Sequence, residues 1–163
     1  MTITEVSQQL YSVLPSPVGP LLVSGDEEAL TGLRFAGDAA PPSAWRRDDG
    51  RFREEARQLA EYFAGERTAF AIAVRLEGPA FDRRVWDALR EIPHGTTTTY
   101  GEIATWIGAP GRARAVGSAN ARNPVAIVVP CHRVIGADGG LTGYAGGLER
   151  KRALLAHEGA ILA

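Results

Sequence analysis

The residues best suited to chemistry lie near the C-terminus, where Cys131, the only cysteine of the chain, stands beside His132. A thiolate is a strong nucleophile, and a neighbouring imidazole can accept the thiol proton. Further along the chain, Glu158 supplies a carboxylate that can orient the imidazole through its second nitrogen. This set indicates nucleophilic attack by sulfur. Most free cysteines are buried and inert, so a packing role stays open as the alternative.

The placement of Cys131 depends on the segment before it. The apolar run Val125–Val129 predicts a buried strand, and Pro130 must end its hydrogen-bond ladder, so Cys131 falls at a strand end. Consecutive strand side chains point to opposite faces, so Cys131 and His132 need either a tight turn or a water molecule between them. We expect the water relay. We also expect a lowered thiol pKa, because His132 and Arg133 can be cationic.

Composition excludes several kinds of site. A single cysteine excludes an internal disulfide and a Cys-rich zinc site, and the three histidines are scattered. No Gly-rich loop follows a predicted strand in a nucleotide-binding pattern, so we expect no cofactor and no metal. No apolar run is long enough to span a bilayer, and Met1–Leu10 lacks the plan of a signal peptide. The sequence therefore predicts a protein of the reducing cytoplasm without a membrane partner.

Two short helices are predicted upstream of the cysteine. Thr99 and Glu102 fit a capping box at the start of the first helix, which ends at Gly108. The second helix follows a turn containing Gly and Pro; its small residues permit close approach to a groove, and Arg114 and Arg122 can reach phosphates or bases. This pair is typical of a helix-turn-helix, and an ordinary helical hairpin is the alternative.

The remaining elements divide the chain into a mixed first part and a helical second part. The predicted strands are Tyr11–Leu14, Leu21–Ser24, Gly32–Phe35 and Ala69–Leu76. One helix runs from Phe52 to Phe63 and is closed by Gly65, and a second carries Phe81, Val85, Leu89 and Ile92. Residues 1–80 hold eight arginines and twelve acidic residues, whereas residues 81–163 hold ten basic and seven acidic residues. The second part therefore suits a polyanionic partner on one face.

Three motifs of the second part occur together in a fixed order. They are "RAVGSANARNP" at residues 114–124, "PCHRV" at 130–134 and "GYAGGLERKRALLAHEG" at 143–159. Through them the chain closely resembles the O6-alkylguanine-DNA alkyltransferases, or methylated-DNA–protein-cysteine methyltransferases. "SPVGPLLV" and "LTGLRF" resemble the N-terminal hairpin of that family.

The resemblance implies an α+β fold with two domains. Residues 1–78 would form a small, ribonuclease H-like supporting domain of mixed α/β structure with antiparallel strands. Residues 79–163 would form a mainly helical domain that contains the helix-turn-helix, binds DNA and accepts the alkyl group.

The resemblance also implies a reaction. Members flip an alkylated guanine out of the duplex and move the alkyl group from its O6 atom to a cysteine, once per molecule. For this chain the implied partner is double-stranded DNA containing O6-alkylguanine, bound by a monomer with no cofactor and no zinc. Cys131 would be the acceptor, His132 would take its proton through water, and Glu158 would orient the imidazole. Tyr100 matches the tyrosine that hydrogen-bonds the flipped guanine, and Lys151 matches a lysine near the thiol.

Further residues are assigned by the same resemblance. Arg114 matches the arginine that replaces the extruded base in the stack, and Asn123 matches the asparagine that ties the recognition helix to the active-site segment. Some relatives carry serine at the position of Ala145, so one hydroxyl contact to the guanine oxygen would be absent here. The residues implied to contact DNA are Arg114, Ala115, Ser118, Arg122 and Asn123. Those implied to line the substrate pocket are Pro130, Val134, Tyr144, Ala145 and Gly146.

Three other functions compete with this interpretation. A non-catalytic protein that binds alkylated DNA is the main alternative, but relatives of that kind carry another residue, often tryptophan, where this chain has Cys131. A Cys–His hydrolase fits poorly with adjacent Cys131 and His132 and with a helix-turn-helix. The third is a helix-turn-helix regulator with an incidental cysteine.

Overall fold

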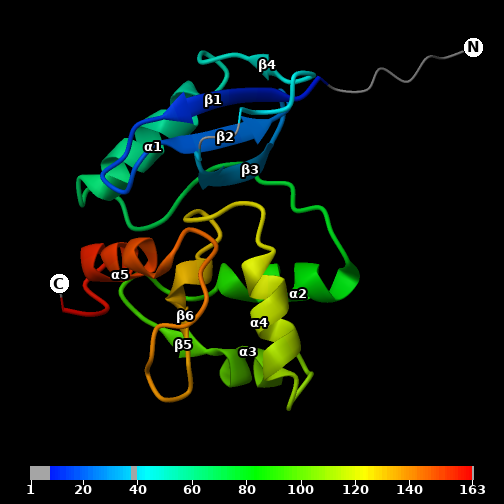
Figure 1. Cartoon of the computed structure of the whole chain (residues 1–163), viewed down its shortest axis with the longest axis vertical. Helices are drawn as coiled ribbons and strands as arrows, with labels where there is room; N and C mark the ends of the chain where they lie inside the picture. The colour runs from blue at the N-terminus through cyan, green and yellow to red at the C-terminus, as the bar shows by residue number, and fades with distance from the viewer. Residues whose placement is uncertain (1–7, 38–39, 163) are drawn as a thin grey trace, which may run out of the picture. The chain divides into compact units, whose positions relative to one another are not determined.

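The computed structural model of the protein describes residues 8–37 and 40–162. The chain divides into two compact units, Met1–Arg75 and Leu76–Ala163 (Figure 1). Over the described residues, the first unit contains a mainly antiparallel sheet and one helix, and the second is mainly helical. The predicted α+β fold class is therefore confirmed.

The sheet of the first unit has the strand order β3-β2-β1-β4. Burial alternates along β1, where Leu10, Ser12 and Leu14 are more buried than the residues between them, as expected for a strand with one face toward the core. β1, β2 and β3 pair antiparallel, and the short β4 pairs parallel with β1. The elements of this unit are β1 (Leu10–Leu14), β2 (Leu21–Gly25), β3 (Leu30–Phe35), β4 (Arg46–Arg47) and α1 (Arg53–Phe63). The first three predicted strands and the helix closed by Gly65, which has a φ of 78°, are confirmed.

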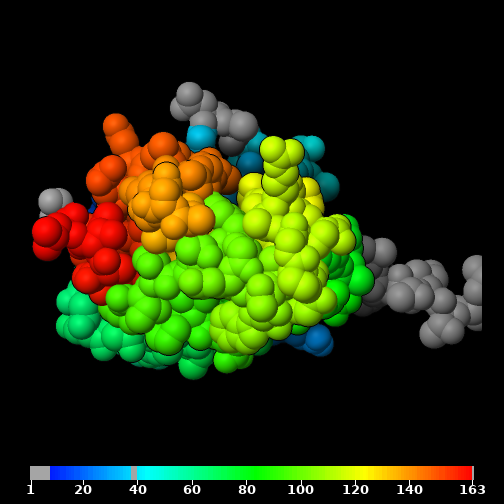
Figure 2. Space-filling model, turned by 90° about the horizontal axis from the view of Figure 1, so that it is seen from below, coloured from blue at the N-terminus to red at the C-terminus, as the bar shows by residue number. Residues whose placement is uncertain are grey.

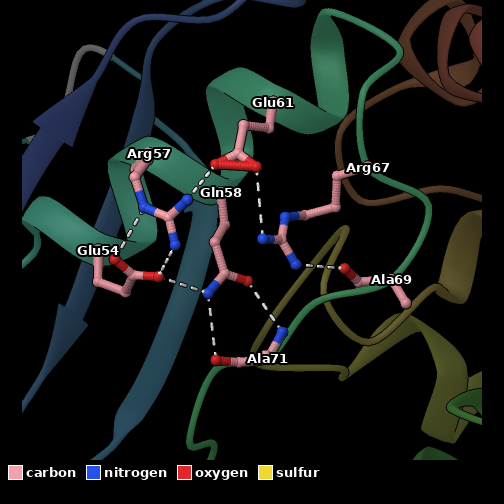
Figure 3. Close-up of polar contacts among 7 residues, drawn as sticks. All are labelled: Glu54, Arg57, Gln58, Glu61, Arg67, Ala69 and Ala71. Atoms are coloured by element: carbon pink, nitrogen blue, oxygen red, sulfur yellow. Dashed lines mark hydrogen bonds and ion pairs between the residues drawn. The ribbon is translucent and has the colours of Figure 1, made fainter.

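The strand predicted at Ala69–Leu76 is wrong. This segment is irregular and makes only one bridge to the sheet, between Val74 and Leu30. The side chain of Gln58 on α1 takes the place of a neighbouring strand: its Oε1 accepts from Ala71 N at 2.8 Å, and its Nε2 donates to Ala71 O at 3.2 Å (Figure 3). Because these main-chain groups are already paired, the apolar pattern does not lead to a ladder.

Figure 3 also shows how α1 holds the segment that follows it. Arg57 bridges Glu54 and Glu61, and Arg67 donates to Glu61 and, at 3.0 Å, to the carbonyl of Ala69. Exposed ion pairs of this kind contribute little stability individually. Here they accompany the paired contacts of Gln58 in fixing the chain after the helix.

The second unit is built from four α-helices, a 3₁₀-helix and a two-stranded parallel sheet (Figure 1). Its buried side chains include Val85, Leu89, Ile103, Val116 and Leu154. The elements are α2 (Ala80–Leu89), β5 (Thr98–Thr99), α3 (Tyr100–Trp106), α4 (Ala113–Ala121), η1 (Cys131–Arg133), β6 (Val134–Ile135) and α5 (Leu148–His157). The capping box of α3 forms as predicted, with Glu102 N donating to Thr99 Oγ1 at 3.1 Å.

The strand predicted at Val125–Val129 is also wrong. These residues form consecutive turns, in which Val129 N donates to Val125 O at 3.0 Å. Ile127 has a φ of 70°, a left-handed conformation that β-branched residues rarely adopt. The side chain of Asn123 makes up for the missing ladder, because its Nδ2 donates to Val129 O at 2.8 Å and its Oδ1 accepts from Val125 N at 3.0 Å.

Candidate active site

Cys131 opens the 3₁₀-helix η1 directly after Pro130 and is almost fully buried. Its N–H donates to Val129 O at 2.8 Å, and its carbonyl accepts from Asn120 Nδ2 at 3.3 Å. The backbone therefore turns at this point, which is the first of the two arrangements that the sequence left open. In this turn α4 and the preceding loop position the thiol from two sides.

His132 and Glu158 are brought together as predicted, and Arg133 joins them. His132 Nε2 lies 2.9 Å from Glu158 Oε2. Arg133 donates to both oxygens of the same carboxylate at 2.8 Å each, and to Ile92 O at 2.6 Å. All three side chains are buried, so the carboxylate pairs with the guanidinium and orients the imidazole at the same time.

The second ring nitrogen of His132, Nδ1, is placed to take part in proton transfer. Within the described residues, the buried His132 Nδ1 has no hydrogen-bond partner. Burial lowers the pKa of His132, against the opposing effect of Glu158, so the imidazole is biased toward its neutral form. A neutral imidazole with an open nitrogen is able to accept a proton.

The expectation of a lowered thiol pKa is not met by the structure. Burial raises the pKa of the Cys131 thiol, although hydrogen bonds from Asn123 and Tyr144 and the charge of Lys151 act in the opposite direction. Arg133 does not supply the expected positive charge because its guanidinium is paired with Glu158. In this resting arrangement the sulfur is held as a thiol.

Tyr100 and Lys151 meet at Thr142, in the loop between β6 and α5. Lys151 Nζ donates to Thr142 O at 2.7 Å, and Thr142 Oγ1 donates to the Tyr100 hydroxyl at 3.1 Å. The Lys151 ammonium lies 6.0 Å from the centre of the Tyr100 ring. Burial lowers the pKa of Lys151 to about 8, and the charge of Cys131 as a thiolate would raise it.

The residues expected to line a substrate pocket differ in their surroundings. Pro130 and Val134 are buried, and Val134 pairs with Thr98 in the small sheet. Tyr144 is partly buried, and its hydroxyl acts to lower the pKa of the Cys131 thiol. The neighbouring Ala145 is exposed, and Gly146 is partly buried, with its carbonyl accepting from Arg150 at 3.1 Å. Of this group, Tyr144 is the one that the structure joins to the thiol.

The residues expected to contact DNA lie on α4 or directly after it. Arg114 and Ser118 are exposed, and Ala115 is partly buried. Figure 2 shows α3 and α4, in green to yellow-green, on one face of the second unit beside the loop 136–147, in orange. Arg122 does not extend freely from this face, because it forms a two-point ion pair with Asp82 of α2. The side chain of Asn123 instead hydrogen-bonds main-chain groups of the loop before Cys131.

Sequence reasoning missed two residues that the structure places at this site, and it assigned a different role to Arg133. Asp82 and Thr142 gave no signal, since an acidic residue on an amphipathic helix and a threonine in a loop are both common. Arg133 belongs to the motif "PCHRV". Because it lies two residues after Cys131, the sequence suggested that its charge would act on the thiol. The distant Glu158 is its actual partner.

In residues 8–37 and 40–162 no three His, Cys, Asp or Glu side chains converge in a way that could hold a metal ion. Over the same ranges, none of the helices combines the length and the apolar character that crossing a bilayer requires.

Comparison with known proteins places this site in a family. The family model for the 6-O-methylguanine DNA methyltransferase ribonuclease-like domain matches residues 9–76, and the model for the DNA binding domain of the same family matches residues 80–160. A methylated-DNA–protein-cysteine methyltransferase of Methanosarcina acetivorans is 53% identical over 152 residues, which are 91% of this chain and 97% of the relative. The protein of that name from Mycobacterium bovis is 55% identical over 89% of both chains.

Solved structures agree with the sequence matches. The crystal structure of the Mycobacterium tuberculosis O6-methylguanine methyltransferase superposes with a TM-score of 0.89 at 53% identity and covers 94% of each chain. The crystal structure of the Mycobacterium tuberculosis protein in complex with DNA has a TM-score of 0.88 at 53% identity, over 93% of each chain. Both family models, near-full-length relatives and the buried cysteine site agree, and the chain belongs to the 6-O-methylguanine DNA methyltransferase family.

Proposed function

We propose that this protein repairs O6-alkylguanine in double-stranded DNA by moving the alkyl group to Cys131, once per molecule. The observation that carries the proposal is the buried thiol, which lies in η1 beside His132, whose imidazole is held by Glu158 and has one open nitrogen. The names of the relatives and the DNA complex of the Mycobacterium tuberculosis protein support the same reaction and the same partner.

The proposed step balances without a cofactor. The thiol proton passes through a water molecule to His132 Nδ1, and Cys131 Sγ then attacks the alkyl carbon. The carbon–sulfur bond forms while the bond from carbon to guanine O6 breaks. The bond electrons pass to the guanine, which takes up a proton from solvent on a ring nitrogen, while the His132 imidazolium returns its proton to solvent. The products are guanine and a thioether on Cys131.

The resting protonation states suit this sequence of events. His132 can accept a proton only while it is neutral, and burial biases it that way. Glu158 stabilises the imidazolium as it forms, and Arg133 keeps the carboxylate in place. The charge of Lys151 then stabilises the thiolate, since the two groups interact electrostatically.

Base flipping is part of the proposal. The exposed face of α4 would approach a DNA groove, with Arg114 entering the stack in place of the extruded base. The extruded guanine would reach Tyr100 and Tyr144 next to Cys131. Unstacking costs a few kcal/mol, which contacts of this kind must offset.

Stoichiometric action follows from the proposed product. A thioether has no good leaving group and resists water, so Cys131 is not regenerated. We assign the chemistry and the DNA contacts to residues 79–163 and a supporting role to residues 1–78. A cytoplasmic location belongs to the same proposal, because the acceptor thiol must stay reduced.

Mass spectrometry of the intact protein tests the proposal. After incubation with a duplex containing O6-methylguanine, one added CH2 group should appear on the peptide that carries Cys131, and the same duplex without the lesion should add none. Cys131→Ser should form no adduct while it still binds DNA. Binding without an adduct in the wild-type protein would support the non-catalytic alternative, and turnover beyond one equivalent would refute stoichiometric transfer.

A further inference from the structure

Asp82 and Arg122 form an ion pair within the second unit, between α2 and the C-terminal end of α4. Arg122 Nε and Nη2 donate to the two oxygens of Asp82 at 2.7 and 2.9 Å. The Asp82 side chain is only 4% exposed, whereas that of Arg122 is 57% exposed. The hydrogen bond from Arg122 lowers the pKa of Asp82, so the buried carboxylate is held in its ionised form.

A second polar contact accompanies the ion pair between α4 and α2. Trp86 Nε1, one helical turn after Asp82, donates to Ala119 O at 2.8 Å. Ala119 and Arg122 are three residues apart, so both contacts hold the last turn of α4. Together they fix this end of the helix against α2.

The same end of α4 holds the segment that carries the thiol. Asn123, directly after Arg122, is hydrogen-bonded to the main chain of Val125 and Val129. Asn120, one residue after Ala119, donates to the carbonyl of Cys131. The residues paired with α2 therefore alternate with the residues that position Cys131.

We propose that Asp82 is a positioning residue for alkyl transfer: through Arg122 it fixes the end of α4, and thereby Asn123 and the loop before Cys131. This inference rests on the proposed function. In the same contact Asp82 neutralises Arg122, so the Arg122 charge is withheld from the phosphates of bound DNA. Asp82 thus favours the reaction and reduces the general affinity for DNA.

Two variants separate these effects. Asp82→Asn keeps the size of the side chain but weakens its hold on Arg122. Transfer from duplex DNA and from free O6-benzylguanine should both slow by about tenfold or more, since loss of a charged hydrogen-bonded pair costs more than 1.4 kcal/mol. Affinity for unmodified duplex should rise, and its salt dependence should steepen by up to about one phosphate contact, because Arg122 is released.

Arg122→Gln completes the comparison. It should also slow both transfer reactions, but leave the salt dependence of DNA binding at the wild-type value. Arg122→Lys keeps the charge without the two-point geometry and should restore part of the rate. Asp87→Asn, an exposed acidic position on the same helix, is the matched control and should leave both rates unchanged.

A readout independent of alkyl transfer is hydrogen exchange of the Val125 amide, which donates to Asn123 Oδ1. This amide should exchange faster in Asp82→Asn and at the wild-type rate in Asp87→Asn. Equal exchange in both variants would overturn the positioning role, even if the wild-type protein transferred no alkyl group. If Arg122→Gln slowed only the duplex reaction and flattened its salt dependence, Arg122 would be a phosphate contact, and the inference would be wrong.

Discussion

At the scale of single residues, burial favours the uncharged forms of the proposed nucleophile and of its proposed base. Cys131 is buried and biased toward the thiol, and His132 is biased toward the neutral imidazole. Both groups are therefore favoured in their neutral forms. This avoids the free-energy cost of burying a thiolate and an imidazolium. In the proposed mechanism, transfer of the Cys131 thiol proton to His132 Nδ1 is therefore a step of the alkyl transfer.

Glu158→Gln tests this account of the proton. The variant keeps the shape of the side chain but no longer stabilises an imidazolium, so transfer near neutral pH should slow by about tenfold or more. Because burial already raises the thiol pKa, the rate should recover only at alkaline pH, where the thiolate forms without help. Rates measured from roughly pH 6 to 10 check this.

The same variant removes the partner of buried Arg133, so it should also lower the free energy of unfolding by about 3–5 kcal/mol. Glu149→Gln, at an exposed position of α5, is the control for both measurements. A ratio of variant to wild-type rates that is constant with pH would mean that Glu158 is structural only.

Lys151, the only lysine of the chain, gives a second pH dependence. Its pKa falls from the ordinary value of 10.5 to about 8 in the folded protein. Between these values the unfolded chain binds more protons than the folded one, so folding stability contributed by this group rises with pH. Lys151→Met should remove that rise. Urea unfolding at several pH values between about 8 and 10 measures it, and parallel curves for the two proteins would show that Lys151 titrates normally.

At the scale of elements, the sequence predicted the regular structure well and the irregular segments poorly. The strands β1 to β3 and the helices α1 to α4 follow from apolar periodicity and from turn and cap residues. The segments Ala69–Leu76 and Val125–Val129 are as apolar as strands, but their main-chain groups pair with the side chains of Gln58 and Asn123. Such pairing depends on distant residues, so no local pattern reveals it.

The capping box of α3 offers an element-scale prediction. Thr99→Ala removes the acceptor for Glu102 N and should destabilise the protein by about 1 kcal/mol. Fraying of the first turn should also displace Tyr100, the first residue of the helix, and slow the reaction with O6-benzylguanine. Thr105→Ala, on an exposed position of the same helix, is the control. Equal unfolding midpoints for the two variants would show that the box contributes nothing.

At the scale of the whole molecule, the basic second part is the one that carries the site. The two family models meet near the boundary between the two units. The model of the ribonuclease-like domain matches residues 9–76, and the model of the DNA binding domain matches residues 80–160. The proposed catalytic set could be named from sequence because the motifs themselves contain Cys131, His132 and Glu158. Asp82 and Thr142 were not predicted, because they lie outside the motifs and only the fold brings them to the candidate site.

Arg114→Ala tests how the molecule engages DNA. The side chain is exposed on α4, so its loss should slow repair of duplex DNA by about tenfold to a hundredfold, the value of a contact worth 1–3 kcal/mol. Reaction with free O6-benzylguanine, which needs no flipping, should change little. Arg152→Ala, exposed on α5, is the charge-matched control. Equal losses on both substrates would place Arg114 in the catalytic pocket.

A repeated feature of the molecule is a side chain that donates to a main-chain carbonyl of an irregular segment. Gln58 bonds Ala71, Asn123 bonds Val129, Arg133 bonds Ile92 and Lys151 bonds Thr142 in this way. Every residue type offers the same carbonyl, so we expect the contact to constrain the residue type at the donor position and not at the acceptor position. These pairs should therefore be silent in analyses of correlated substitution, although each of them holds an irregular segment of its own unit. For contacts of this kind, the absence of covariation between two positions is no sign that they lie apart.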